Sequence, residues 1–149
     1  MLSVTYLAIY HEEVIGYFTL STDNIKLSNL EENYKDKFED KDIYYKVFPA
    51  VKLGRFAIDK KCQNKGVGRF LFERILYISV MASKQIGFRF ISIDAYGDAY
   101  NFYKKMKCKD TLKKKKLENK LNEFEKANLQ NKYNITIRLS LDLYLHNPQ

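Results

Sequence analysis

The chain has 149 residues, of which 46% are hydrophobic and 15% aromatic, and its formal net charge is +8. This composition excludes an intrinsically disordered chain, and the length predicts one domain with a full hydrophobic core. No apolar run approaches the length of a membrane span and no signal peptide is recognisable, so we expect a cytoplasmic protein that does not associate with membranes.

The first part of the chain predicts a β-hairpin, a polar segment and a buried strand. Two β-branched and aromatic runs, residues 4–10 and 14–21, predict strands joined by a turn at His11-Glu12-Glu13. Residues 27–40 are polar with apolar residues at helical spacing, which predicts a helix or a partly ordered loop. The apolar run at 50–58 then has the pattern of a buried strand.

The second part of the chain alternates helices and strands. The spacing of apolar residues predicts a helix over 70–86, a strand over 88–95 and a short helix over 98–107. This order predicts an α/β fold, with parallel strands at the centre of a mixed sheet and helices on both of its faces. A charged helix at about 112–131 looks like an insertion, and the alternation over 135–145 predicts a strand with one buried face.

The most specific local pattern is the loop Gln63-Asn64-Lys65-Gly66-Val67-Gly68, between the strand at 50–58 and the helix at 70–86. Consecutive backbone N–H groups in a glycine-containing turn that leads into a helix form a phosphate site. Glycine has no Cβ, so the backbone can approach the anion closely. Two better-known phosphate loops are excluded. Leu71 replaces the third glycine of the dinucleotide fingerprint, and the Gly-Lys-Ser/Thr of a P-loop is absent.

A second pattern follows at the end of the strand at 88–95. Its residues Ala99, Phe102 and Tyr103 have the spacing A-x-x-F-Y. Together, the two patterns resemble motif A and the later strand–helix element, A-x-x-F-Y-x-x-x-G-F, of the GCN5-related N-acetyltransferases (the GNAT superfamily). Residues 106–108 depart from this ending because no Gly-Phe pair follows, and Tyr96 stands where the family often has asparagine. The resemblance covers roughly residues 4–145 and is most specific over 50–108.

The resemblance implies a single-domain GNAT fold that uses acetyl-CoA as co-substrate, an amine as acceptor and no metal. In that family the loop amides bind the pyrophosphate of coenzyme A, and the preceding strand binds the pantetheine arm. The residues that would bind acetyl-CoA are Phe56, Ala57, Ile58, Gln63, Asn64, Lys65, Gly66, Val67, Gly68, Arg69 and Phe70. The resemblance assigns the catalytic acid to Tyr103, which would protonate the leaving thiolate. A backbone N–H near Phe56 or Ala57 would polarise the thioester.

No residue stands out as the general base or as an activated nucleophile. His11 and its two glutamate neighbours lie in a predicted turn and His146 lies at the tail, so we expect all of them to be exposed. Asp94 is either a helix cap or a polar group of the site. Cys62 and Cys108 have the spacing of neither a disulfide framework nor a metal site, and we expect free thiols in a reducing compartment.

The acceptor side departs from the family, whose members usually open with a strand and one or two helices before the first hairpin. Here the hairpin begins close to Met1, so we expect these elements to be shortened. Either a partner subunit covers the region, or the acceptor side is unusually open, or the reading frame is truncated. An uncovered sheet edge would pair with another chain, so we expect a homodimer. The run at 48–59 resembles toxins that acetylate aminoacyl-tRNA, and the basic charge fits tRNA. One alternative is a non-catalytic acetyl-CoA-binding or interaction module of the same fold. Another is an unrelated phosphate-binding α/β protein.

Overall fold

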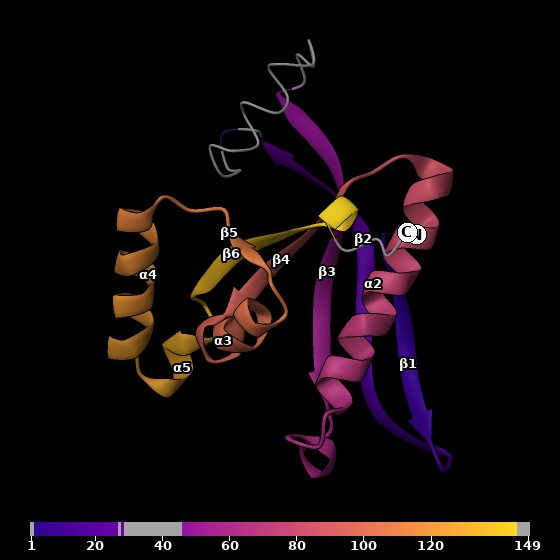
Figure 1. Cartoon of the computed structure of the whole chain (residues 1–149). Helices are drawn as coiled ribbons and strands as arrows, with labels where there is room; N and C mark the ends of the chain where they lie inside the picture. Colours follow the sequence, from indigo (N-terminus) through magenta and orange to yellow (C-terminus); the bar gives the residue numbers. More distant parts are fainter. Residues whose placement is uncertain (1, 27, 29–45, 146–149) are drawn as a thin grey trace. The chain divides into compact units, whose positions relative to one another are not determined.

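The structure, a computed structural model, describes residues 2–26, 28 and 46–145 (Figure 1). Six strands form a mixed sheet in the order β1-β2-β3-β4-β6-β5, so the predicted α/β fold is confirmed. The elements in chain order are β1 (Val4–Tyr10), β2 (Glu13–Lys26), β3 (Val47–Ile58), η2 (Lys60–Cys62), α2 (Val67–Ile86), β4 (Phe90–Tyr96), α3 (Gly97–Lys105), β5 (Lys109–Asp110), α4 (Lys114–Lys126), α5 (Leu129–Lys132), β6 (Thr136–Asp142) and η3 (Leu143–Leu145). The predicted polar segment at 27–40 lies, except for Ser28, outside the described residues.

The chain divides into two compact units. Unit 1 comprises Met1–Asp23, Pro49–Ile91 and Asp142–Gln149. Unit 2 comprises Asn24–Phe48 and Ser92–Leu141. Unit 1 therefore contains the predicted phosphate loop, and unit 2 contains the predicted catalytic tyrosine.

The N-terminal hairpin of unit 1 is confirmed. β1 and β2 pair antiparallel, with Tyr10 opposite Glu13, so the turn consists of two residues, His11 and Glu12. Both have positive φ, 45° and 66°, which is the geometry of a type I′ turn and matches the twist of the strands. β2 continues beyond the predicted end of the strand, to Lys26.

Helix α2 lies across the strands of unit 1 (Figure 1) and buries Leu71, Phe72, Ile75 and Ser79. It begins three residues before the predicted start, because Gly66 in the left-handed conformation already turns the chain into the helix. It ends at Gly87 as predicted. This residue has φ 61°, and its N–H donates to the Ser83 carbonyl.

The last strand differs from the prediction. β6 ends at Asp142, and the chain continues as a 3-10 turn. The prediction of one buried face is wrong at this end, because Ser140 and Asp142 are buried on the face that was expected to be polar. The Asp142 carboxylate is buried with a partner: Arg89 donates from Nε to Oδ1 (3.0 Å) and from Nη2 to Oδ2 (2.7 Å).

We expect Asp142→Ala to lower the free energy of unfolding by about 2 kcal/mol, measured by urea denaturation. The Asp142 side chain is 1% exposed, so its loss leaves the Arg89 guanidinium without its carboxylate. Arg89 is itself 30% exposed, and water limits the cost. Glu73→Ala is the control, since it breaks the Arg69–Glu73 pair, whose side chains are 72% and 56% exposed. We expect a change below about 0.5 kcal/mol there. Equal losses for the two variants would contradict a structural role for the buried pair.

In unit 2, β5 and β6 pair antiparallel, with Lys109 opposite Ser140. The sequence did not predict β5, which has only two residues. The predicted charged segment forms two helices, α4 and α5. The Asn128 side chain caps the second by accepting from the Asn131 N–H (3.0 Å). Phe124 of α4 packs so closely on Gly97 that a Cβ there would overlap its ring.

Candidate functional site

The phosphate loop is tied to the strands that precede it. The Asp59 N–H donates to the Ile15 carbonyl (2.9 Å), and the Asp59 carboxylate accepts from the Lys61 N–H (2.7 Å). The Gln63 side chain donates from Nε2 to the carbonyl of Ile58, the last residue of β3 (2.9 Å). These bonds fix the loop against β3 and give the Gln63 side chain a structural role.

The loop residues 63–66 are all exposed. Asn64 and Gly66 adopt the left-handed conformation, with φ of 59° and 85°. A Cβ built at Gly66 meets no atom within 4 Å, so the space beside it is open. None of the described side chains caps α2, and its first backbone bond runs from the Phe70 N–H to the Gly66 carbonyl (3.0 Å). The N–H groups of residues 67–69, which come before it, have no partner within the helix. Such groups at a helix N-terminus can bind an anion.

Basic side chains surround this helix end. Lys60, Lys61, Lys65 and Arg69 are all exposed, and Arg69 forms an exposed pair with Glu73 (3.0 Å). Phe70 is 57% exposed, and the Arg74 guanidinium lies 5.9 Å from the centre of its ring. Positive charge beside free N–H groups can hold a pyrophosphate.

Close contacts with β2 shape the strand before the loop. A Cβ at Gly16 would lie 2.8 Å from the Ala57 carbonyl oxygen, so only glycine permits this approach. Thr19 Oγ1 accepts from the Arg55 N–H (2.7 Å), and a Cβ at Gly54 would lie 2.7 Å from the same oxygen. The half-buried residues Phe56, Ala57 and Ile58 follow directly. Gly16 and Thr19 thus support the predicted acetyl-CoA strand, and the sequence did not indicate either of them.

In unit 2, Tyr103 lies on α3 and is 6% exposed. Its ring meets the Phe102 ring edge-on, with centroids 5.2 Å apart. Burial, and after it the proximity of Cys108, raises the pKa of the Tyr103 hydroxyl. A tyrosine hydroxyl is protonated at neutral pH even without this shift, and the raised pKa makes Tyr103 a weaker acid than an exposed tyrosine.

Tyr100, on the same helix, is bonded differently. Its hydroxyl donates to Asp110 Oδ1 (2.9 Å), and Lys104 Nζ contacts Asp110 Oδ2 (2.7 Å). Burial, and after it the bond to Asp110, raises the pKa of Tyr100 to about 12. Tyr100 is thus engaged in a structural cluster and provides a comparison for Tyr103.

The end of α3 reconciles the departure at residues 106–108 with the family pattern. Lys107 occupies the glycine position of A-x-x-F-Y-x-x-x-G-F, and its φ is 64°. The Lys107 N–H donates to the Lys104 carbonyl and the Cys108 N–H to the Tyr103 carbonyl, both at 3.0 Å. This pair of bonds is a Schellman motif, which glycine normally closes. Cys108, at the phenylalanine position, is 1% exposed.

We expect Lys107→Gly to raise the free energy of unfolding by about 1 kcal/mol. A residue that has a side chain is strained at positive φ, and glycine avoids this cost. Lys105→Gly is the control, since it places glycine inside α3 and should destabilise by about 0.5–1 kcal/mol. Urea denaturation measures both. A loss of stability in both variants would show that Lys107 contributes more through its side chain than its backbone costs.

The other predicted polar residues reveal no base. His11 and Glu12 are exposed in the hairpin turn, Asp94 is half-buried and interacts with other groups, and His146 lies outside the described residues. The described residues contain no group of three or more His, Cys, Asp or Glu side chains that could hold a metal. None of the described helices is long and apolar enough to cross a membrane.

The two cysteines are free thiols, with Cys62 half-buried and Cys108 buried. Burial raises the pKa of Cys108 to about 12. The Cys108 thiol is therefore protonated at neutral pH.

Tyr96, which stands where the family often has asparagine, is 44% exposed and meets the Tyr133 ring edge-on, with centroids 5.8 Å apart.

No protein-family model and no curated protein sequence matches this chain. Solved structures do match, and those named here have the GNAT fold. A chain of the KacTA–DNA complex matches this chain with TM-score 0.67 and 19% identity. The match covers 97% of this chain and 70% of the chain in that complex. AtaT complexed with acetyl-methionyl-tRNAfMet matches 76% of this chain and 66% of its own, with TM-score 0.66 and 27% identity. AtaTR bound with acetyl-CoA matches 97% and 72%, with TM-score 0.65 and 24% identity. The chain thus has the GNAT fold and spans about two thirds of the length of these neighbours.

Proposed function

We propose that this chain, which has the GNAT fold, is an acetyl-CoA-dependent N-acetyltransferase. The observation that carries the proposal is the exposed loop at 63–66, which opens an uncapped helix through a left-handed glycine. The neighbouring basic side chains suit the pyrophosphate of coenzyme A. The similarity to AtaTR, solved with acetyl-CoA, supports the same ligand here.

The proposed reaction transfers the acetyl group directly to an amine. The amine nitrogen attacks the thioester carbonyl carbon, the carbon–sulfur bond breaks, and the sulfur leaves as a thiolate. Holding the two substrates together supplies much of the rate, because a bimolecular step becomes effectively unimolecular. A backbone N–H near Phe56 or Ala57 would stabilise the oxyanion. The amine proton would pass to water, since none of the described residues has been assigned as the general base.

Tyr103 is the proposed acid, which gives its hydroxyl proton to the thiolate. Its support is the match of Phe102 and Tyr103 to the family motif and the motif-like backbone turn after α3. Like any tyrosine hydroxyl, this group is protonated at neutral pH and has a proton to give. Tyr103 is buried, as an aromatic residue that only packs in the core would also be. Burial therefore does not distinguish the two roles, and a kinetic measurement is the test.

An aminoacyl-tRNA is the proposed acceptor. The net charge of +8 and the similarity to AtaT, solved with acetyl-methionyl-tRNAfMet, favour it. AtaT is named as a toxin with an antitoxin, AtaR, and we extend a toxin role to this chain. Binding of tRNA should then weaken steeply between about 50 and 200 mM salt. Failure to bind tRNA at low salt would exclude this acceptor and leave a small amine or a protein.

A homodimer is proposed from the edge of the sheet in unit 1. β1 is the terminal strand, and its residues Leu7 and Ile9 are 58% and 63% exposed. An apolar strand edge invites pairing with another chain. Light scattering at micromolar concentration checks this, and a monomeric mass would contradict it.

The decisive test of enzymatic function is thiol release from acetyl-CoA in the presence of aminoacyl-tRNA and a panel of amines. We expect thiol release to depend on both the protein and an acceptor. The alternative, a non-catalytic acetyl-CoA-binding module, predicts binding without acceptor-dependent release. The absence of both binding and release would favour the unrelated phosphate-binding protein.

A further inference from the structure

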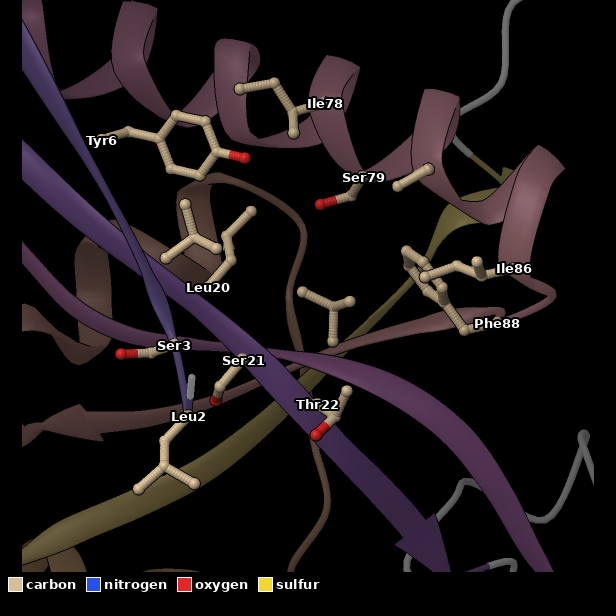
Figure 2. Close-up of a pocket in the computed structure, with 13 residues that line it drawn as sticks. Leu2, Ser3, Tyr6, Leu20, Ser21, Thr22, Ile78, Ser79, Ile86 and Phe88 are labelled. Carbon is tan, nitrogen blue, oxygen red and sulfur yellow. The ribbon is translucent and has the colours of Figure 1, made fainter.

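Unit 1 contains an open groove that the proposed acetyl transfer does not use. It lies between the β1–β2 hairpin and the C-terminal half of α2 and has a volume of ≈ 290 Å³ (Figure 2). This volume is close to the lower end of small-molecule pockets, roughly 300 Å³. The lining residues are Leu2, Ser3, Val4, Tyr6, Leu20, Ser21, Thr22, Val51, Ile78, Ser79, Ala82, Ile86 and Phe88.

Ser79 is the unusual member of this lining. It is 1% exposed, and within the described structure its hydroxyl has no hydrogen-bond partner. Figure 2 shows the Ser79 oxygen directed from α2 into the groove, toward the strands. A helical serine can instead bond to its own helix, as Ser83 does to the Val80 carbonyl (2.8 Å). A buried hydroxyl without a partner is costly, so a group that occupies the groove and bonds to Ser79 would be favoured.

The chemistry of the lining defines the ligand. None of the lining residues carries a charge, and the polar ones are all hydroxyl side chains. A carboxylate or an ammonium in the groove would lose hydration without gaining a counter-charge. The remaining side chains are apolar and favour a hydrocarbon body. We propose that this groove binds a small neutral amphiphile, with an apolar body and one hydroxyl or amide that hydrogen-bonds to Ser79.

The probe for this test is 1-octanol, with octanoate at pH 7.5 as its charged counterpart. Methyl NMR of the intact chain would follow the lining residues Ile78 and Ile86 during the titration. We expect saturable shifts with 1-octanol and at least tenfold weaker binding of octanoate. No saturable shift at millimolar 1-octanol, or equal binding of both probes, would overturn the proposal.

Two neighbouring serines give a matched pair of variants. Ser79→Ala should raise the melting temperature of the free protein by roughly 2–4 °C, because it removes an unpartnered hydroxyl. The same variant should weaken 1-octanol binding by about three- to tenfold. Ser83→Ala, whose hydroxyl is already bonded within α2, should leave 1-octanol binding unchanged. A lower melting temperature for Ser79→Ala, or equal effects of both variants on binding, would contradict the assigned role of Ser79.

Ala82→Phe tests the space itself, because the larger side chain fills the groove from α2. We expect it to abolish 1-octanol binding without changing the molecular mass in solution. If this variant instead changes the mass and leaves 1-octanol binding intact, the groove is an interface between copies of the chain and the proposal is wrong. Neither outcome depends on acetyl-CoA.

Discussion

Replacing Gly66 with valine is expected to weaken acetyl-CoA binding about a hundredfold while the protein remains folded. Gly66 has φ 85°, and the space that its Cβ would enter is open in the structure. A β-branched residue disfavours this conformation, and its side chain would project into the proposed anion site. Loss of two charge-assisted bonds to the pyrophosphate, at about 1.5 kcal/mol each, corresponds to this factor. Isothermal titration calorimetry measures it.

Gly87→Val is the control for this variant. Gly87 terminates the same helix at its other end with φ 61°, and a Cβ there also meets nothing within 4 Å. Both substitutions should therefore lower stability by a similar amount, about 1–2 kcal/mol. Only Gly66→Val should lose acetyl-CoA. If both variants bind acetyl-CoA as the wild type does, the loop is not the pyrophosphate site.

Replacing Tyr103 with phenylalanine is expected to lower kcat by about 10²–10⁴-fold while the Kd for acetyl-CoA stays unchanged. The substitution removes one hydroxyl and keeps the ring that packs against Phe102. A group that acts on the thiolate contributes only as the carbon–sulfur bond breaks, so its loss appears in kcat. Steady-state kinetics of thiol release, together with calorimetry, separate the two effects.

Tyr100→Phe is the matched control on α3. It removes a hydroxyl that donates to Asp110, so it should cost stability of about 1 kcal/mol and leave kcat within a few-fold. Equal kcat values for the wild type and Tyr103→Phe would remove Tyr103 from the mechanism. Equal losses of kcat in both tyrosine variants would indicate a general disturbance of α3.

The elements that the sequence predicted well are those defined by local patterns. The hairpin followed from β-branched runs on either side of a short turn, and α2 from apolar spacing that ends at Gly87. The burial of Asp142 was not predictable, because it depends on Arg89, which is 53 residues away in sequence and whose approach only the fold determines. A strand of two residues such as β5 carries no pattern of its own.

In the candidate site, too, local patterns were predictable from sequence and long-range contacts were not. The loop at 63–68 was accessible from sequence because its proposed function uses backbone groups, which glycine positions reveal. Gly16 and Thr19 of β2 support β3, the strand that leads into the loop, and nothing in their local sequence indicates this. At position 107, lysine in place of glycine suggested a departure from the family motif. The backbone there nevertheless keeps the left-handed turn that the motif requires.

In the proposed complex, the N–H groups at the start of α2 hold the pyrophosphate of acetyl-CoA. Amide NMR during an acetyl-CoA titration tests it most directly. We expect large, saturable shifts at Val67, Gly68 and Arg69, and their loss in Gly66→Val. Saturable binding that leaves these three amides unshifted would contradict it.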